Sequence, residues 1–386
     1  MKPILCLFAA GLLLGMSPAF ATKVSPTDYT VPVSTAEQLR LDGSYSYAGV
    51  GDTTLTNNAS GSLLYNRFYN SLPFAFDINL LALGSTQYAG EDVDRNNSSS
   101  IILSSGVRKY LSNDGNWFYS IEVGMTHQNE FDRPSITTTP GVGYGRFISA
   151  TPLAKAVRIE DFLINEGVIK GSLPKVTMIE LAHIIENEAE YRTIHGATYK
   201  GFWYEAMEKE IAKSGKFAAE GLGAIGVLRI EEVLFQERIN ERFYGWDVRF
   251  GVRAELLSEY EDIDVDDPGA SIRARYSHPL GWKSQIGLAA TYDSPFNGDF
   301  GDVYNASGTA NYIYEIGNRI DFTLDNTYVS SKFIPEADSV WSDQLRAGFI
   351  YYLENQMNVT LSGNMSKTKD MDLSKGLNLT FGYRFK

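Results

Sequence analysis

The feature that most constrains this chain is a strict alternation of apolar and polar residues in many short segments. Residues 357–365 place their apolar side chains on one face: Met357, Val359, Leu361 and Met365. Alternation with period two is the pattern of a β-strand, whose successive side chains point to opposite faces of a sheet. The last residues repeat it, with one face made of Leu377, Leu379, Phe381, Tyr383 and Phe385. Each such strand has an apolar face and a polar face of equal length.

The connections between these segments alternate in length. Further alternating segments lie at residues 72–80, 117–125, 246–256, 286–292, 320–324 and 345–351. Tight turns are expected near residues 70–73, 112–115, 278–281, 315–318 and 353–356. The other connections are longer and polar, near residues 50–56, 86–98, 127–135, 258–268, 293–303, 330–340 and 367–374. A soluble sandwich would share the strand pattern, but short and long connections that alternate predict an up-and-down arrangement with two different ends.

Aromatic residues gather at the end of the strands where the short turns lie. They are Tyr65, Phe68, Phe74, Tyr110, Trp117, Tyr144, Trp246, Tyr276, Trp282, Tyr312, Tyr351, Phe381 and Phe385. Amphipathic rings prefer the boundary between lipid and water, and a closed barrel is the sheet that leaves no backbone group unpaired in lipid. We therefore predict an all-β membrane fold, an up-and-down antiparallel transmembrane β-barrel of about 14 strands, within the range of about 12 to 16.

The first residues have the pattern of a cleaved secretory signal. Lys2 precedes an apolar run, and Ala19 and Ala21 are the small residues at which a signal peptidase cuts. The run is shorter than the roughly 20 residues that a spanning helix needs, so we predict a signal peptide at residues 1–21. Cys6, the only cysteine, lies within it, so the mature chain would have no thiol. The net charge of −13 argues against binding to nucleic acid.

The signal peptide, the alternating turns and the aromatic last strand together resemble bacterial outer-membrane β-barrel proteins. The resemblance implies an outer-membrane location and contact with membrane lipid and lipopolysaccharide. It also implies recognition by the barrel assembly machinery through Phe381, Tyr383 and Phe385. Lys386 after the terminal Phe385 departs from that pattern. No single family within this class is identified.

Residues 151–243 do not alternate and divide the barrel into residues 22–150, with about six strands, and residues 244–386, with about eight. Thr151 and Pro152 begin a helix that Gly167 ends, and three more helices are expected near residues 174–196, 203–213 and 218–241. This four-helix insertion follows the sixth strand and is therefore placed on the periplasmic side. Glycines at positions 141, 143 and 145 leave space for it to enter the lumen, or relieve barrel curvature.

The polar faces of several strands carry charged residues, which a barrel would direct into its lumen. The predicted pore-lining residues are Asp77, Glu122, Asp247, Arg249, Arg253, Glu255, Arg273, Arg275, Asp321, Asp325 and Arg346. Basic and acidic walls would set a field across a conducting pore. The alternative is a salt-bridged network that fills a closed lumen.

The stretch GLGAIG at residues 221–226 has the glycine spacing of a dinucleotide-binding loop. That chemistry needs a buried strand before the glycines, and here a polar helical stretch precedes them. The small residues Ala219, Gly223 and Gly226 instead suggest a helix face that packs closely against a neighbour. No cofactor is predicted.

Two functions remain open. The first is a passive outer-membrane channel whose helical insertion gates or docks the pore. The second is a non-conducting anchor, whose insertion binds a periplasmic protein of a secretion, envelope-maintenance or polymer-export assembly. An enzyme is not predicted, because the histidines at 127, 183, 195 and 278 lie in no catalytic or metal-binding arrangement.

Overall fold

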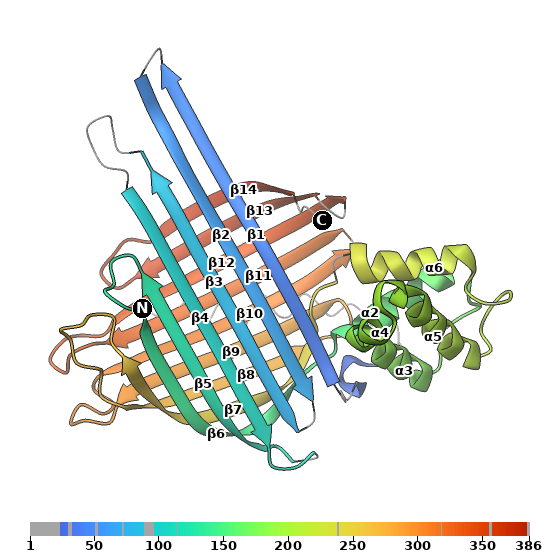
Figure 1. Ribbon diagram of the computed structural model, residues 1–386, viewed down its shortest axis with the longest axis horizontal. Helices are drawn as coiled ribbons and strands as arrows, with labels where there is room; N and C mark the ends of the chain where they lie inside the picture. Colours follow the sequence, from blue (N-terminus) through green and yellow to red (C-terminus); the bar gives the residue numbers. More distant parts are fainter. Residues whose placement is uncertain are drawn as a thin grey trace.

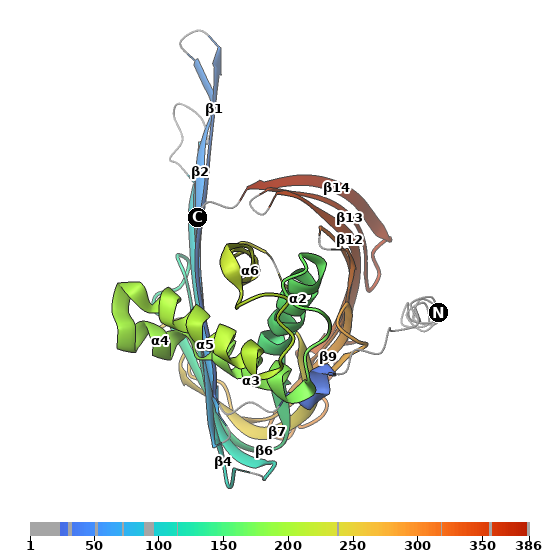
Figure 2. The same cartoon turned by 90° about the vertical axis from the view of Figure 1, so that its right-hand side faces the viewer.

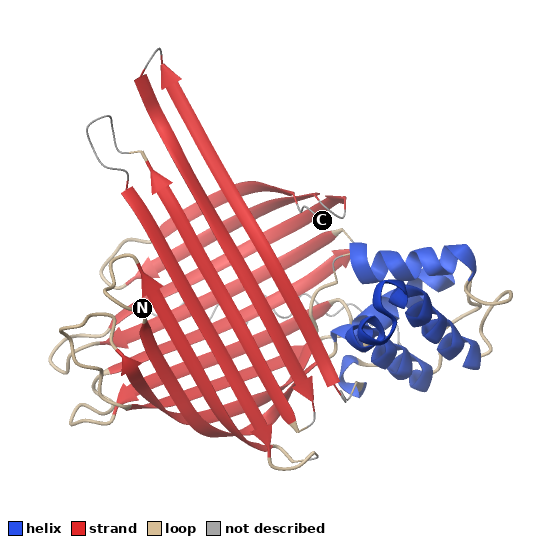
Figure 3. Ribbon diagram, in the orientation of Figure 1, coloured by secondary structure: helices blue, strands red, loops and turns tan. Residues whose placement is uncertain are grey.

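The computed structural model describes residues 24–29, 33–50, 53–71, 73–88, 96–113, 115–237, 239–317, 319–354 and 357–383. It contains one sheet of 14 antiparallel strands in which each strand pairs with its neighbours in sequence (Figures 1 and 3). Before the insertion lie β1 (Val33–Val50), β2 (Thr53–Ser71), β3 (Phe74–Gln87), β4 (Asn96–Tyr110), β5 (Trp117–Gln128) and β6 (Ser135–Ser149). After it lie β7 (Phe243–Leu257), β8 (Gly269–Pro279), β9 (Ser284–Pro295), β10 (Tyr304–Gly317), β11 (Ile320–Lys332), β12 (Val340–Glu354), β13 (Met357–Thr368) and β14 (Ser374–Tyr383). The predicted up-and-down order of about 14 strands is confirmed.

The alternation of connection lengths holds with one exception. Short turns join β2 to β3, β8 to β9, β10 to β11 and β12 to β13, as the sequence predicts. The long connection expected near residues 50–56 is wrong, because β1 and β2 are extended strands of 18 and 19 residues whose pairing continues to Val50 and Thr53. Serine, threonine and asparagine fill this stretch. They look like loop residues in the sequence, but they continue the ladder.

The outward face of the sheet is apolar and exposed. On β5 it presents Trp117, Tyr119, Ile121 and Val123, and on β7 it presents Trp246, Phe250, Val252 and Leu256. At the short-turn end the ring of Tyr144 lies 5.1 Å from Trp117 and 5.7 Å from Trp246, measured between centroids. Three aromatic residues expected in this group lie elsewhere. Phe68 stands opposite Asp77 in the β2–β3 register and so faces the concave side. Tyr110 is buried with its ring 5.2 Å from Phe118, and Trp282 donates a hydrogen bond to the Val24 carbonyl.

A second group of outward aromatic residues lies at the opposite end of the strands, where the sequence did not predict one. Tyr292 stacks with Tyr304 at 6.0 Å, and Tyr328 stacks with Trp341 at 6.5 Å. These residues lie on β9 to β12, close to the longer loops. The apolar outward face therefore has aromatic rings near both of its ends.

The sheet is curved but not closed, so the predicted closed barrel is not observed. Among the described residues β1 and β14 share no pairing, and each forms an edge. Figure 2 shows β1 and β2 running straight while the strands from β7 to β14 follow a curve. Curvature occurs where side chains of the concave face hold strands together across several neighbours. On β1 and β2, Ser44 and Ser60 stand opposite each other and their hydroxyl groups hydrogen-bond to each other.

The helical insertion begins directly after β6. It contains α2 (Thr151–Asn165), α3 (Lys175–Glu186), α4 (Glu188–His195), α5 (Tyr199–Lys213) and α6 (Gly223–Glu231), with a π-helical turn η4 (Glu232–Gln236) after α6. The second predicted helix is divided at Asn187 into α3 and α4, and the last predicted helix begins later and ends earlier than expected. Within the described part of the chain, no helix is both long and apolar enough to cross a membrane.

One apolar core fills the insertion. It is built from α2, α3, α5 and α6, with Leu153, Leu181, Trp203, Met207 and Ile230 almost fully buried. Glu160 is buried beside it and accepts a hydrogen bond from the Leu173 backbone N–H. The Trp203 indole donates to the Ile184 carbonyl at 2.6 Å, which satisfies the polar atom of the largest buried side chain.

The expected helix face through Ala219, Gly223 and Gly226 is wrong, because α6 begins at Gly223 and Ala219 lies exposed in the loop before it. Gly223 is exposed at φ 61°, a left-handed conformation that favours glycine. Gly226 is buried. A Cβ there would stand 3.0 Å from Leu222 and 3.4 Å from Val168. Close packing therefore rests on Gly226.

Replacement of Gly226 by leucine is expected to lower the free energy of unfolding of the insertion by about 1–3 kcal/mol, because the added side chain overpacks the contact with Leu222 and Val168. Denaturant unfolding followed by helical circular dichroism measures the change. Gly201→Leu is the matched control, since Gly201 lies in α5 with open space around it. Equal losses in both variants would contradict the packing role of Gly226.

Candidate functional site

The insertion lies across the short-turn end of the sheet. In Figure 1 its helices stand beyond the ends of the strands, and in Figure 2 α2 and α6 project over the space within the curve of the sheet while α4 extends past β1 and β2. Its entry and exit are tied together, because the Ala150 N–H donates to the Arg242 carbonyl at 2.6 Å and the Arg242 N–H donates to the Thr151 hydroxyl at 3.1 Å. The insertion thus begins and ends at one point on the short-turn end of the sheet.

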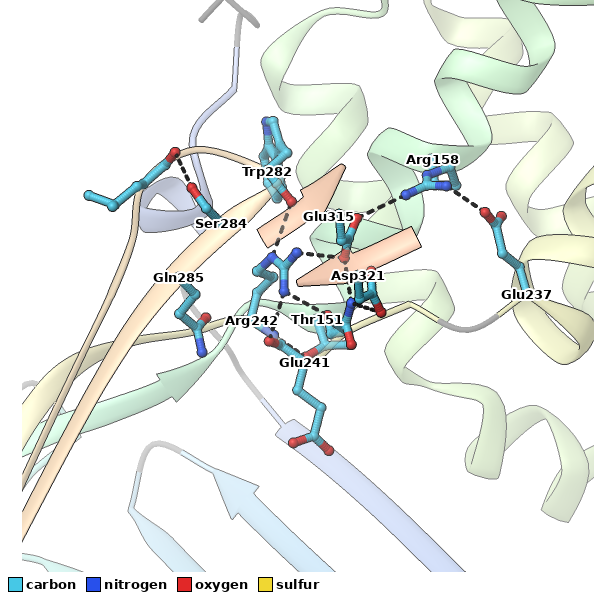
Figure 4. A network of polar contacts seen from close by, with 12 residues as sticks. Thr151, Arg158, Glu237, Glu241, Arg242, Trp282, Ser284, Gln285, Glu315 and Asp321 are labelled. Atoms are coloured by element: carbon cyan, nitrogen blue, oxygen red, sulfur yellow. Dashed lines mark hydrogen bonds and ion pairs between the residues drawn. The ribbon is translucent and has the colours of Figure 1, made fainter. Parts of the chain in front are cut away.

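A buried polar cluster attaches the insertion to strands that are distant in sequence (Figure 4). We call it the junction network, and its members are Arg158, Glu237, Asn240, Arg242, Glu315 and Asp321. Glu315 lies at the end of β10 and receives Arg242 at 2.6 Å and Arg158 at 3.1 Å. Arg158 on α2 also pairs with Glu237 at 2.5 Å. One carboxylate therefore joins α2, the exit of the insertion and the β10–β11 turn.

Arg242 is the most buried charged residue of this network, with a relative exposure of 1%. Its Nε–H donates to the Trp282 carbonyl in the β8–β9 turn at 3.1 Å, so it also reaches a second pair of strands. Burial lowers the pKa of the Arg242 guanidinium, and the Glu315 carboxylate opposes this effect. Burial likewise raises the pKa of Glu237, and Arg158 opposes it. Each charge is tolerated because its partner is present.

The N-terminal strap, residues 24–29, is a third attachment. Val24 and Tyr29 are buried in the core of the insertion, and the carboxylate of Asp28 pairs with Lys175 on α3 at 2.7 Å. The Tyr244 hydroxyl on β7 donates to the Tyr29 carbonyl. The segment that precedes β1 is therefore bound to the insertion and to β7 at the short-turn end of the sheet.

A second charged cluster lies on the concave face of the sheet, away from the insertion. We call it the wall network, and its members are Asp77, Arg108, Glu122, Asp247, Arg249, Arg273 and Arg275. Asp247, with 0% exposure, receives the Arg275 Nη2 at 2.6 Å and the Arg108 Nη1 at 3.4 Å. Arg108 is on β4 and Asp247 on β7, so this contact passes over β5 and β6 and helps to curve the sheet.

Glycine and a buried ring complete this part of the wall. Phe118 on β5 lies against Gly143 on β6, where any Cβ would collide with the ring. The glycine at 143 therefore makes room for an inward aromatic side chain. The sequence suggested two roles for these glycines, space for a helix or relief of curvature. At Gly143 the structure shows a different one, which is space for the Phe118 ring.

The sequence predicted most members of the wall network but not their pairing. Asp77, Glu122, Asp247, Arg249, Arg273 and Arg275 come together as expected. Arg108 was missed, because it shares a face of β4 with Tyr110, which the sequence placed among the outward aromatic residues. The expected separation into a basic and an acidic wall is wrong, because acids and bases interleave on β3 to β8. Salt-bridged pairing is the arrangement seen.

The remaining predicted pore-lining residues lie apart from this cluster. Arg253 is exposed, and among the described residues no ion pair reaches it. Glu255 accepts hydrogen bonds from the Ser135 hydroxyl and the Asp266 N–H. Asp321 belongs to the junction network, and Asp325 stands opposite Arg346 in the β11–β12 register.

The predicted assembly signal falls partly outside the described residues. Phe381 is outward and 74% exposed, in line with its strand pattern. Phe385 and the side chain of Tyr383 lie outside the described residues, as does the predicted signal peptide at residues 1–21.

Comparison with known proteins adds no family assignment. No protein-family model matches this chain, and no curated protein matches its sequence. Its function has to be argued from the two networks and the faces of the sheet.

Loss of the Glu315 charge is expected to weaken the attachment of the insertion to the sheet. Glu315→Gln leaves Arg242 buried without its counter-charge, which should lower the free energy of unfolding of the insertion by about 3–5 kcal/mol. Denaturant titration of helical circular dichroism measures this. Glu232→Gln is the control, because its pair with Arg229 at 2.6 Å is partly exposed and should contribute less than about 1 kcal/mol. If the two variants unfold alike, Glu315 does not hold the insertion.

Proposed function

We propose that this protein is an outer-membrane β-barrel channel whose helical insertion covers and narrows its periplasmic mouth. In this proposal β1 and β14 pair in the membrane and close the sheet. An even number of up-and-down strands makes the two edge strands antiparallel, which is the orientation that such closure needs. Lipid would favour closure, since each unpaired backbone group of an open edge is costly in hydrocarbon.

The outward face carries this proposal. Trp341 and Tyr351 lie at opposite ends of β12 on that face, with Leu345, Ala347 and Phe349 between them and Asp343, which accepts a hydrogen bond from Asn326, next to Trp341. At about 3.3 Å per residue and a strand tilt of about 40°, their separation corresponds to roughly 25 Å across a membrane. That is about the height of the apolar band of outer-membrane barrels. A soluble sheet would not leave so large an apolar face exposed.

The concave face supports a water-filled interior. Charged and hydroxyl-bearing side chains line it, and a barrel of about 14 strands is wider than its own side chains can fill. The insertion lies over one end of this interior and is held by the junction network. Under this proposal the passage of solute is controlled where the insertion meets the β8–β9 and β10–β11 turns.

The anchor remains a second candidate because of one observation on the insertion. Ile194 and Phe202, on α4 and α5, leave large apolar surfaces exposed, and the His195 ring stacks on Phe202 at 3.9 Å. Exposed apolar clusters of this kind serve as contact sites for other proteins. A periplasmic partner on this surface would suit an anchor whose interior stays closed.

Cysteine labelling in intact cells tests the membrane arrangement, with Cys6 as the only native cysteine of the full chain. Phe250→Cys and Arg253→Cys lie on β7 and face opposite sides. A lipid-soluble maleimide should label the Phe250→Cys variant, and a membrane-impermeant maleimide only the Arg253→Cys variant. Impermeant labelling of the Phe250→Cys variant would contradict a lipid-facing outer surface. An Arg253→Cys variant that resists both reagents would favour the closed anchor.

Conductance in planar bilayers tests the channel itself. The wild-type protein should open rarely, because the insertion covers the mouth. Glu315→Gln should raise the open probability about tenfold or more, since the loss of a buried ion pair shifts the seating equilibrium by several kcal/mol. Glu232→Gln should behave as the wild type. Absence of conductance in all three proteins would exclude the channel and leave the anchor.

A further inference from the structure

A pocket of about 590 Å³ lies on the concave face of the sheet, near the end where the longer loops lie. Its lining comes from β1 to β5 and from the start of the β5–β6 loop. Gln128 on β5 alternates with Glu122 and therefore shares the face of the wall network, and the β4–β5 register sets Ser100 opposite Gln128. The volume is within the range of about 300–1,000 Å³ that small-molecule sites occupy.

Two rows of inward side chains, paired from strand to strand, form the floor of this pocket, which we call the serine pocket. The first row is made of Ser44, Ser60, Ser85 and Ser98. The second row is made of Ser62, Leu83, Ser100 and Gln128. Neighbouring strands lie about 4.8 Å apart, so the polar groups are spaced at close to the length of one sugar ring. Leu83 is an apolar contact between two hydroxyl groups.

The hydroxyl groups of the first row keep part of their hydrogen-bonding capacity. Ser44 and Ser60 bond to each other at 2.7 Å, and Ser85 and Ser98 bond to each other at 2.8 Å. A hydroxyl has one donor and two acceptor sites, so each pair keeps one O–H group and three acceptor sites for a ligand or for water. Groups that both donate and accept match the hydroxyl groups of a sugar, which do the same.

Among the described residues that line the serine pocket, Glu130 is the only charged one. Asn129 fixes the start of this loop, because its side chain accepts from the Ser99 N–H at 2.7 Å and donates to the Asn97 carbonyl at 3.2 Å. An anionic solute would meet no counter-charge from this lining, and a metal ion would meet one carboxylate where it needs several oxygen ligands. An apolar solute would leave the serine hydroxyls without partners. The lining therefore fits a neutral, polyhydroxylated ligand.

We propose that the serine pocket binds a neutral oligosaccharide. Its hydroxyl groups bond to the serine rows and to the Gln128 amide, the apolar face of one ring contacts Leu83, and the Glu130 carboxylate accepts from neighbouring hydroxyls. The affinity is weak, on the order of millimolar, because hydrogen bonds to the sugar replace hydrogen bonds to water.

The role of this ligand as a transported solute rests on the proposed channel function. In that channel a solute that enters from the long-loop side meets the serine pocket before it reaches the insertion. Binding itself needs only β1 to β5 and the start of the β5–β6 loop, which form the pocket without closure of the sheet.

Saturation-transfer NMR on the purified protein, in a detergent without a sugar head group, tests the proposal. The probes are the neutral trisaccharides maltotriose, cellotriose and raffinose, with trigalacturonate as their anionic counterpart. At least one neutral probe should give saturable transfer, and trigalacturonate should bind about tenfold or more weakly, because Glu130 repels it and no cation of the lining balances its charge. Transfer to none of the neutral probes would overturn the proposal, as would equal or tighter binding of trigalacturonate.

Paired serine variants test the location of the site. Ser85→Ala with Ser100→Ala removes one hydroxyl from each row and should weaken trisaccharide binding about tenfold. Ser104→Ala with Ser105→Ala is the matched control, since both serines lie on β4 outside the pocket, and it should change the affinity less than about twofold. Equal weakening by the two double variants would contradict binding at the serine pocket. Binding is measured without a membrane, so failure of this site and failure of the channel are distinguishable.

Discussion

The buried contact between Arg242 and Glu315 is the interaction on which the arrangement of this protein depends. It joins the exit of the helical insertion to the end of β10, at 2.6 Å and almost out of contact with water. Burial of two charges is unfavourable unless the pair is intact and further hydrogen bonds satisfy it. Arg158, Asn240 and the Trp282 carbonyl supply those bonds. The same set of contacts therefore fixes where the insertion stands and penalises any other placement.

The two networks join different sets of strands. The wall network joins β3, β4, β5, β7 and β8 from the concave side, and the junction network joins the turns of β8–β9 and β10–β11 to α2. Both pull strands towards a common interior, and the sheet is curved over this span. The strands outside it, β1 and β2, run straight. The N-terminal strap binds the insertion and β7.

Under the proposed channel function, mixed charge on the inner wall would have consequences for a solute in the interior. Separate basic and acidic walls would create a strong transverse field, whereas interleaved ion pairs cancel most of it at short range. What remains is the excess of one guanidinium, set within a protein of net charge −13.

The sequence by itself determined the strands, their order and their two faces. Period-two alternation and connection length are local properties, and they gave the up-and-down sheet of Figure 3, the helical insertion after β6 and six of the seven members of the wall network. It could not give the pairing within that network or the existence of the junction network. Arg158, Arg242 and Glu315 are far apart in the chain, and their sequence context is that of ordinary solvent-exposed charged residues. Only the tertiary structure removes them from water, and burial is what makes each depend on the others. The role of Gly226, unlike that of Ala219, was likewise decided by which neighbour packs against it.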